Sequence, residues 1–498
     1  MSDLLTKEEY KAIASGLSMP TQAFVDGSFR PAKSGKTFDT LNPATGDVLA
    51  KVAACGAEDV GFAVQKARDA FEDGRWSRLH PGERKAVLIR LAKLIQRNAR
   101  ELAVVESLDS GKTIYDCETV DVPETIHCIK WHAELIDKIY DQVSPASDDH
   151  IAMVVREPVG VAGLVLPWNF PLLMLAWKIG PALAAGCSVI VKPAEETSLT
   201  ALCVAELAME AGVPAGVFNV LPGSGPDVGE PLGRHMDVDS LSFTGSTETG
   251  RRFLRYASES NLKEVTLEMG GKNPAVVLDD AENLDRVAVH VVNGAFWNMG
   301  ENCSASSRLI VQKGVKDALL ERIKAHAREW PMGDPLDPVN RIGALVSQAH
   351  FDKVCSYLCE GSKVVMGGTA KAGFVEPTIL EVSKDAPQAR EEIFGPILSV
   401  MTVDSFDEAI ALANDTDYGL AASIFTANVK RAIRGARTIR AGTVTVNSFG
   451  EGDSTTPFGG FKASGFGGRD NGIHAHDQYT QLKTIWIDLS DDAGEVVN

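Results

Sequence analysis

Between residues 161 and 267 the chain alternates short β-rich runs with helical ones, and this alternation constrains the fold most. Five apolar runs end at Leu166, Val191, Val220, Phe243 and Leu267, and a helical pattern follows each of the first four. Strands that alternate with helices favour a doubly wound parallel sheet. Ligands of such sheets bind beyond the carboxyl ends of the strands, so we expect functional residues just past each run.

Polar and glycine residues do follow all five runs, as a nucleotide-binding edge requires. They are Pro167-Trp168-Asn169, Lys192-Pro193-Ala194-Glu195, Gly223-Ser224-Gly225, Thr244-Gly245-Ser246 and Glu268.

A helix-rich part precedes this block, and a second α/β block follows it. Residues 60–71 and about 83–106 have helical periodicity. After residue 268, strand-like runs at 275–278, 308–311 and 443–446 alternate with helical segments. Two further β-like segments, 151–156 and 482–489, lie outside both blocks. We expect them to pair with each other or across a subunit boundary.

Length, charge and cysteine usage exclude several classes of protein. A chain of 498 residues is too long for one ordinary core, and a formal charge of −18 argues against binding to nucleic acid or anionic membranes. The most apolar stretch, 159–177, is interrupted by two prolines and an asparagine, which argues against a membrane span. Eight irregularly spaced cysteines and no signal peptide predict a cytoplasmic protein without disulfides. We expect small molecules or copies of itself as partners, and no metal site.

Lys192 and Glu195 suit an adenosine ribose, because an ammonium donates to hydroxyl oxygens and a carboxylate accepts from them. A carboxylate near O2′ would repel a 2′-phosphate, which favours NAD over NADP. A rotated Glu195 beside Lys192 could still admit NADP. Taken alone, the two residues are as readily an ordinary Lys and Glu at a helix start.

Two turns are further candidates for holding phosphates. Gly245 and Ser246 precede a helix whose free N–H groups would face an anion, although any Ser N-cap has this composition. Gly225 and Gly229 lie in a weaker pattern that is more typical of a turn opening a helix.

Cys303 lies in a small, polar, non-helical segment directly after a helical run, between Asn302 and Ser304. Glu268 ends a strand 35 residues upstream. The first offers a nucleophile and the second a base. A lone cysteine is most often a small buried hydrophobe, and a lone Glu268 could be an ordinary strand-end carboxylate. Because both residues occur in such settings in one chain, a catalytic role is favoured over these two alternatives.

These two segments, 267–274 and 296–307, resemble the signature motifs of the NAD(P)-dependent aldehyde dehydrogenases, and the resemblance extends from about residue 20 to the end. It implies a Rossmann-type cofactor domain (1–138 and 160–267), an α/β catalytic domain (268–477) and a small β oligomerisation element (139–159 and 478–498). It also implies a dimer or a tetramer.

The resemblance assigns a role to each catalytic residue. Cys303 adds to an aldehyde to form a thiohemiacetal, and Asn169 with the Cys303 N–H stabilises the oxyanion. Loss of hydride leaves a thioester, and Glu268 activates the water that hydrolyses it. Lys178, beside the nicotinamide in the family, is counted with these catalytic residues. The cofactor residues are Leu166, Pro167, Trp168, Lys192, Glu195, Gly225, Gly229, Gly245, Ser246, Gly250, Gly270, Glu392 and Phe394.

Segments 452–462 and 479–487 resemble bacterial polyamine-pathway members, which act on γ-glutamyl-γ-aminobutyraldehyde, 4-guanidinobutyraldehyde or simpler ω-aminoaldehydes. A broad-specificity or betaine-type enzyme is the alternative. Acidic groups would attract such substrates, and Glu118, Asp121 and Glu124 on a predicted helix and Glu451 with Asp453 are candidates. A solvated acidic face is the other interpretation of both sets. The substrate candidates are Trp177, Trp297, Asn302, Ser304, Phe461, Asp453 and Asp121.

Two other functions stay open on this sequence. One is a binding protein that keeps the fold without turnover, against which Cys303, Glu268, Asn169 and Lys192 argue. The other is a CoA-acylating relative, against which Glu268 argues because it favours water as the acyl acceptor.

Overall fold

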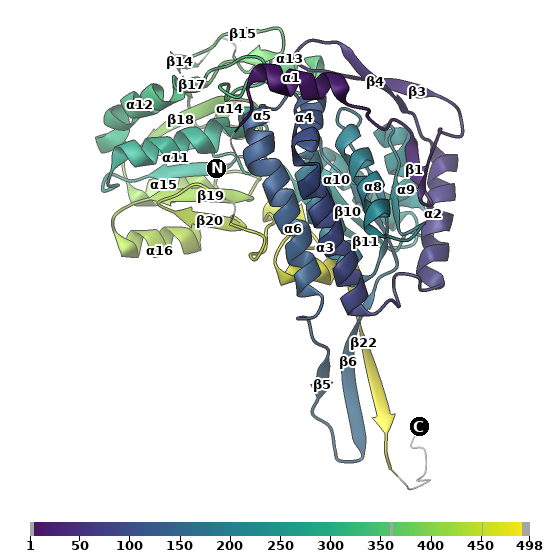
Figure 1. Cartoon of the computed structure of the whole chain (residues 1–498). Coiled ribbons are helices and arrows are strands. Elements are labelled where there is room, and N and C mark those ends of the chain that lie inside the picture. Colours follow the sequence, from purple (N-terminus) through teal and green to yellow (C-terminus); the bar gives the residue numbers. More distant parts are fainter. Residues whose placement is uncertain (1–3, 359–361, 451, 491–498) are drawn as a thin grey trace.

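The computed structural model describes residues 4–358, 362–450 and 452–490, and it contains two large α/β blocks and a projecting three-stranded arm (Figure 1). The first block contains an eight-stranded sheet in the order β2-β1-β9-β8-β7-β10-β11-β21. Strands β7 to β11 run parallel, and the edge strands β1, β2 and β21 are antiparallel. The bounds are β1 Ala23–Val25, β2 Ser28–Arg30, β7 Val161–Val165, β8 Ser188–Lys192, β9 Phe218–Val220, β10 Ser240–Gly245, β11 Glu264–Met269 and β21 Gly465–Phe466.

Helices cover both faces of this sheet, which explains why its parallel strands β7 to β11 are buried at nearly every position. Val189 and Val191 of β8 pack in one core and Ile190 in another, because successive side chains of a strand point to opposite faces. Helices α3, α4, α6, α7 and α8 contribute to the first core, and α2, α9 and α10 to the second. The bounds are α2 Ala57–Glu72, α3 Pro81–Arg97, α4 Ala99–Ser110, α6 Val122–Leu135, α7 Pro171–Ala185, α8 Leu199–Ala211, α9 Glu230–Arg234 and α10 Thr247–Ser258.

Two predicted helices are divided in the structure. The helix expected over about 83–106 is interrupted at Asn98, whose φ of −103° and ψ of 23° end α3 before α4 begins. The helix expected after the third apolar run begins as a π-helical turn, η2 (Gly225–Gly229), that runs into α9. The doubly wound sheet itself is confirmed.

The second block contains a seven-stranded sheet in the order β14-β17-β18-β13-β12-β19-β20. Its central strands β12, β13 and β18 are parallel and buried, and β20 forms one edge. The bounds are β12 Pro274–Val277, β13 Arg308–Gln312, β14 Lys363–Met366, β17 Thr378–Glu381, β18 Ile397–Val403, β19 Ala421–Phe425, β20 Thr443–Val446, α11 Leu284–Phe296, α12 Lys313–Ala327, α13 Gln348–Ser356, α14 Pro387–Arg390, α15 Phe406–Asn414 and α16 Val429–Thr438.

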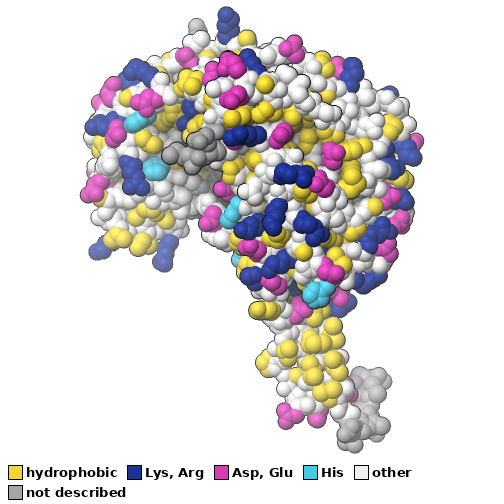
Figure 2. Space-filling model, viewed as in Figure 1, with side chains coloured by type: hydrophobic (Ala, Val, Ile, Leu, Met, Phe, Trp, Pro, Cys, Tyr) yellow, Lys and Arg dark blue, Asp and Glu magenta, His cyan; other side chains and the backbone are white. Residues whose placement is uncertain are grey.

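The two isolated β segments pair with each other. Strand β6 (His150–Pro158) pairs antiparallel with β22 (Thr480–Asp488) from Thr480↔Pro158 to Asp488↔His150, and β5 (Gln142–Ser144) completes the sheet. This arm extends away from both blocks (Figure 1) and carries many apolar side chains on its surface (Figure 2). The remaining elements are α1 Lys7–Gly16, β3 Thr37–Leu41, β4 Val48–Ala53, α5 Ile114–Asp116, η1 Cys117–Asp121, η3 Trp297–Gly300, β15 Ala370–Lys371, β16 Phe374–Val375, η4 Lys462–Ser464 and η5 Ile473–Tyr479.

Across the described ranges, the model contains no helix with both the length and the apolar character that a bilayer crossing requires. The seven cysteines in these ranges are free, and Cys359 lies outside them.

Candidate active site

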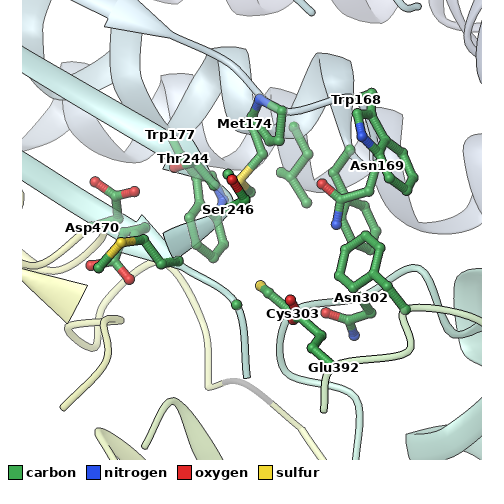
Figure 3. Close-up of a pocket in the computed structure, with 18 of the residues that line it drawn as sticks. Trp168, Asn169, Met174, Trp177, Thr244, Ser246, Asn302, Cys303, Glu392 and Asp470 are labelled. Carbon is green, nitrogen blue, oxygen red and sulfur yellow. The ribbon is translucent and has the colours of Figure 1, made fainter. Parts of the chain in front are cut away.

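A cavity of about 270 Å³ lies where the carboxyl ends of β7, β10 and β11 meet the second block. Cys303, Asn169 and Glu268 all line it, although they come from three separate segments. Figure 3 shows Asn169 and Cys303 directed into this space from opposite walls, with Asp470 at one end. The structure therefore brings the predicted nucleophile, oxyanion donor and base together.

The Cys303 loop is held by side-chain amides on both sides. Asn273, at the start of β12, donates from Nδ2 to the Cys303 main-chain oxygen (2.8 Å). Asn302 Oδ1 accepts from both the main-chain N and the Oγ of Ser304, at 3.0 Å each. Gly300, with φ +70°, has no room for a side chain, since a Cβ would lie 2.3 Å from the Gly395 oxygen.

Glu268 ends β11 and is almost completely buried. Its carboxylate lies against the glycine-rich loop, where a Cβ on Gly459 would be 2.5 Å from Oε1. Burial raises the pKa of Glu268 well above its ordinary value, and the nearby Asp470 carboxylate raises it further. A carboxyl group with a raised pKa can take a proton from water more readily, as a general base must.

Asp470 is a cavity residue that the sequence analysis missed, and it explains the place of Lys178. Lys178 Nζ donates to Ser242 Oγ (2.8 Å) and lies 3.4 Å from Asp470 Oδ2. Lys178 is fully buried and does not line the cavity, so it acts on the site through Asp470. Its expected place beside the nicotinamide stays a prediction.

Aromatic and apolar side chains form the rest of the cavity wall. Trp177 packs edge-on against Phe458 with ring centroids 5.2 Å apart, and Phe170 packs against Trp297 at 5.3 Å. Met174 lies between Phe170 and Trp177 on the face of α7 that lines the cavity. Trp177 and Trp297 thus lie where the sequence placed them, whereas Phe170, Met174 and Phe458 were not anticipated.

Asp121 does not line the cavity, and this expectation is wrong. Its side chain is completely buried and forms an ion pair with Lys112 (2.5 Å). The Lys112 ammonium lies 3.9 Å from the Phe170 ring centroid. Glu118 is also buried and accepts a hydrogen bond from Tyr10. Neither residue belongs to a solvated acidic face, because the π-helical turn η1 directs both inward.

Three more substrate candidates lie outside the cavity lining. Ser304 is buried beneath the loop and bonded to Asn302, which itself does line the cavity. Phe461 is half exposed and faces Arg469, with the guanidinium carbon 5.7 Å from its ring centroid. Asp453 lies in an exposed loop and accepts from Thr455 N (2.9 Å). Glu451 lies outside the described residues.

A second cleft continues from the cavity, and Pro167, Trp168, Gly245 and Ser246 line both. Leu166, Lys192, Glu195, Gly225 and Gly229 line its outer part, as predicted for cofactor residues. Lys192 Nζ lies 3.0 Å from Glu195 Oε2, and Glu195 Oε1 accepts from Gly225 N at 2.6 Å. Gly250 lies outside the cleft lining. Its missing side chain leaves room for Met269 to pack against α10, since a Cβ on Gly250 would lie 2.5 Å from Met269 Sδ.

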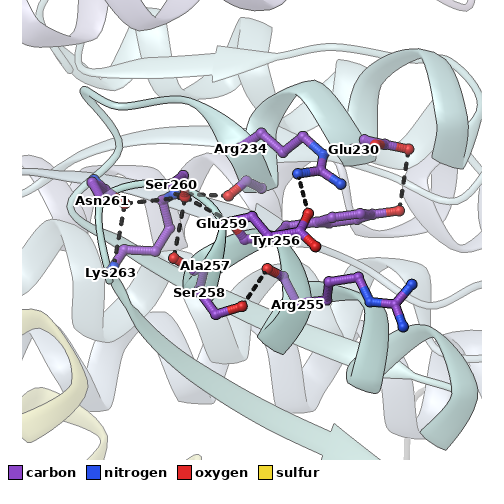
Figure 4. A network of polar contacts seen from close by, with 11 residues as sticks. Glu230, Arg234, Arg255, Tyr256, Ala257, Ser258, Glu259, Ser260, Asn261 and Lys263 are labelled. Atoms are coloured by element: carbon purple, nitrogen blue, oxygen red, sulfur yellow. Dashed lines mark hydrogen bonds and ion pairs between the residues drawn. The ribbon is translucent and has the colours of Figure 1, made fainter.

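Two residues that line this cleft belong to a polar network between α9 and α10 (Figure 4). Tyr256 Oη donates to Glu230 Oε2 (3.2 Å), and both residues line the cleft. Arg234 donates to Glu230 Oε1 (2.7 Å) and to Glu259 Oε2 (2.6 Å). The network fixes the two helices relative to each other.

Glu392 lies where the cavity and the second block meet. Its Oε1 accepts from Gly271 N (2.8 Å), and burial raises the pKa of its carboxyl group. A Cβ on Gly270 would lie 2.1 Å from Glu392 Oε2, so a side chain at this position would displace the Glu392 carboxylate. The Phe394 ring packs edge-on against Trp168 with centroids 5.2 Å apart.

His350 and Lys353, one turn apart on α13, also line the cavity and were missed. His350 Nε2 lies 2.7 Å from the Phe394 main-chain oxygen, and burial lowers the pKa of the imidazole to about 4. No local motif marks α13, so spatial proximity alone identifies these residues.

Several known proteins resemble this chain in sequence and in fold. The model of the aldehyde dehydrogenase family matches residues 29–485. The chain is 67% identical over 496 residues to aminoacetaldehyde dehydrogenase of Pseudomonas aeruginosa, covering 98% of this chain and 100% of the relative. Two solved structures superpose with a TM-score of 0.96. One is an indole-3-acetaldehyde dehydrogenase in complex with NAD⁺, with 48% identity and coverage of 97% of this chain and 100% of that one. The other is γ-glutamyl-γ-aminobutyraldehyde dehydrogenase of Burkholderia cenocepacia, with 49% identity and coverage of 98% and 100%. The chain therefore belongs to the aldehyde dehydrogenase family and is an NAD(P)-dependent oxidoreductase.

Proposed function

We propose that the protein oxidises a short ω-amino aldehyde to the amino acid, with NAD(P)⁺ as oxidant. The convergence of Cys303, Asn169 and Glu268 on one cavity carries the chemical part of this proposal. The substrate class is supported by the relative that acts on aminoacetaldehyde, and by Asp470 beside the aromatic wall.

In the reaction, Cys303 Sγ bonds to the aldehyde carbon while the carbonyl π electrons move to oxygen. The Asn169 side-chain amide donates a hydrogen bond to this oxyanion. When the oxyanion collapses, the carbon loses hydride and a thioester remains. Glu268 then removes a proton from water as the water oxygen attacks, and the acid leaves as the carbon–sulfur bond breaks.

The cofactor cleft has the groups that NAD(P)⁺ requires, and we assign residues 1–138 and 160–267 to cofactor binding. Lys192 and Glu195 would hold the adenosine ribose, and the N-terminus of α10 with Ser246 would face a phosphate. Glu392 would accept from the nicotinamide ribose hydroxyls. When bound, the nicotinamide accepts the hydride. The Glu195 carboxylate supports NAD, and because this side chain is 41% exposed, it could exchange its bonds to Lys192 and Gly225 N for water and rotate to admit NADP.

Two aldehydes of equal size test the substrate class. Aminoacetaldehyde and propanal have the same number of heavy atoms and differ in one ammonium group. With either cofactor, we expect kcat/KM for aminoacetaldehyde to exceed that for propanal at least tenfold, measured by absorbance at 340 nm. The panel also includes 3-aminopropanal, 4-guanidinobutyraldehyde, betaine aldehyde and hexanal. A clear preference for hexanal or propanal would overturn the amino-aldehyde proposal, and no turnover with any aldehyde would favour a non-catalytic protein.

We further propose that segments 139–159 and 478–498, of which 491–498 lie outside the described residues, assemble the protein as a dimer or tetramer through the arm. Leu482, Trp486 and Leu489 project from this arm into solvent, as do Tyr140 and Val143. Strand β22 also leaves one edge unpaired in the described sheet. Exposed apolar side chains on an open sheet edge are typical of an interface. A monomeric mass by light scattering at micromolar concentration would count against it. We also expect the cytoplasmic location that the free cysteines favour.

A further inference from the structure

A single buried side chain, Asn298, joins the loop that carries Asn169 to the loop that carries Cys303. Its Nδ2 donates to the Asn169 main-chain oxygen (3.1 Å) and to the Glu301 main-chain oxygen (3.0 Å). Asn169 Nδ2 donates to the same Glu301 oxygen at 2.9 Å. Asn298 therefore fixes the main chain of Asn169 and also the acceptor of its side chain.

The local geometry indicates that this arrangement is specific. Asn298 is fully buried, and its Oδ1 has no hydrogen-bond partner. The two hydrogen bonds that Nδ2 donates therefore determine the orientation of the side-chain amide. Asn298 and Met299 have φ of +53° and +56°, a left-handed conformation that costs about 1 kcal/mol or more for a non-glycine residue. Such strain persists only where surrounding contacts enforce it, and the amide of Asn298 supplies two of them.

The bond to Glu301 also determines where Asn169 can donate next. A side-chain amide nitrogen carries two hydrogens in fixed planar positions. One hydrogen of Asn169 Nδ2 is directed to Glu301, and the other is left for the cavity, into which Figure 3 shows the amide pointing across from Cys303. A small rotation of Asn169 would misalign this second hydrogen with the oxyanion.

We propose that Asn298 is a positioning residue that holds the Asn169 amide in its oxyanion-binding orientation. The proposal rests on the proposed function of Asn169. As Cys303 adds to the aldehyde, negative charge develops on the carbonyl oxygen, and a donor that is already oriented needs no reorganisation at that moment. Asn298 does not touch the substrate, and its effect passes through Asn169.

A double-mutant cycle with Asn169→Ala tests this inference. Asn298→Gly removes the amide and accepts the positive φ, and Asn298→Asp keeps the shape but replaces the donating amide with a carboxyl group. With propanal and saturating NAD⁺, we expect each Asn298 variant to lower kcat about 10- to 100-fold with KM changed less than twofold. Asn169→Ala should cost about 10²–10³, as for loss of one oxyanion donor. In the Asn169→Ala background, either Asn298 change should lower kcat less than twofold further.

Two control measurements detect a general displacement of the loop. The Kd for NAD⁺ from fluorescence quenching and the rate of Cys303 alkylation by iodoacetamide should be unchanged in both Asn298 variants. Wild-type kcat in the Asn298 variants would overturn the inference. It would also be overturned if the Asn298 change lowered kcat by the same factor in the Asn169→Ala background as in the wild type, or if it altered the rate of Cys303 alkylation. Full activity of Asn169→Ala alone would instead overturn the proposed oxyanion role. If Asn298→Gly fails to fold, Asn298→Asp carries the test.

Discussion

Two buried histidines should make the protein sensitive to acid. His132 on α6 and His476 on η5 lie with ring centroids 5.7 Å apart, and a Cβ on Gly180 of α7 would touch the His132 ring at 2.9 Å. Burial lowers the pKa of His476 to about 4, with Arg156 and Arg84 lowering it further. Burial also lowers the pKa of His132 well below its ordinary value, and His476 adds to that effect. Both imidazoles are neutral in the folded protein at pH 7.

The sign and magnitude follow from proton linkage. An unfolded histidine binds its proton near pH 6.5, whereas folded His476 resists protonation until about pH 4. Its contribution to stability is therefore complete above pH 6.5 and is lost as the pH falls toward 4. Between pH 7 and pH 5 the free energy of unfolding should fall by about 2 kcal/mol for this residue alone. Buried carboxyl groups with raised pKa, such as Asp109, act in the opposite direction.

Substitution isolates the histidine from these other groups. The free energies of unfolding of the wild type and His476→Leu are measured in urea at pH 7 and pH 5, under conditions where refolding is complete. The wild type should lose about 2 kcal/mol relative to the variant between the two values of pH. His474→Leu is the matched control, because His474 is exposed, and it should show no such difference. If the free energies of unfolding of the wild type and His476→Leu differed by the same amount at pH 7 and pH 5, the argument from burial would be refuted.

Three further predictions concern catalysis, cofactor choice and assembly. Glu268→Gln should keep a rapid burst of NADH while the steady-state rate falls about 10²–10⁴-fold, and an undiminished steady state in rapid-mixing kinetics would contradict the role of Glu268. Glu195→Gln should narrow the preference for NAD⁺ over NADP⁺ about tenfold in kcat/KM, because the carboxylate no longer repels a 2′-phosphate. Trp486→Lys should shift the mass in light scattering toward smaller species, because Trp486 is 64% exposed on the arm, and an unchanged mass would remove it from the interface.

The sequence misses the short antiparallel strands β1, β2 and β21, but it predicts the five parallel strands β7 to β11 of the first block to within about two residues, for a physical reason. Each strand is buried on both faces, so its residues form a continuous apolar run that polar residues end sharply. The break at Asn98 carries no such signal, because neither glycine nor proline lies near it in the chain. The pairing of β6 with β22 joins segments more than 300 residues apart in the chain. The alternation of apolar and polar residues identifies each segment as a strand but does not identify the strand with which it pairs.

The same distinction separates the parts of the site that were found from those that were not. Cys303, Glu268 and Asn169 lie in local motifs, whereas Asp470 meets Lys178 from 292 residues away. Phe170, Met174 and Trp177 lie at i, i+4 and i+7, so extending the helical face back from the predicted Trp177 could have found Met174. The Asp121 side chain is buried because it pairs with Lys112 and because η1 is a π-helical turn. The spacing of the acidic residues in the sequence reveals neither feature.

The buried charges around the cavity imply that the substrate itself helps to ionise the base. Asp121 is paired with Lys112 outside the cavity, whereas Glu268 and Asp470 line it together with Trp177 and Phe458. Burial and Asp470 hold the pKa of Glu268 high, which leaves less of the active, ionised base. A substrate ammonium near these groups attracts the ionised carboxylate and lowers that pKa. The acid limb of kcat should therefore lie at lower pH for aminoacetaldehyde than for propanal, over the pH range where the amine is protonated. Coincident acid limbs under conditions where deacylation limits the rate would show that the ammonium lies too far from Glu268 to act on it.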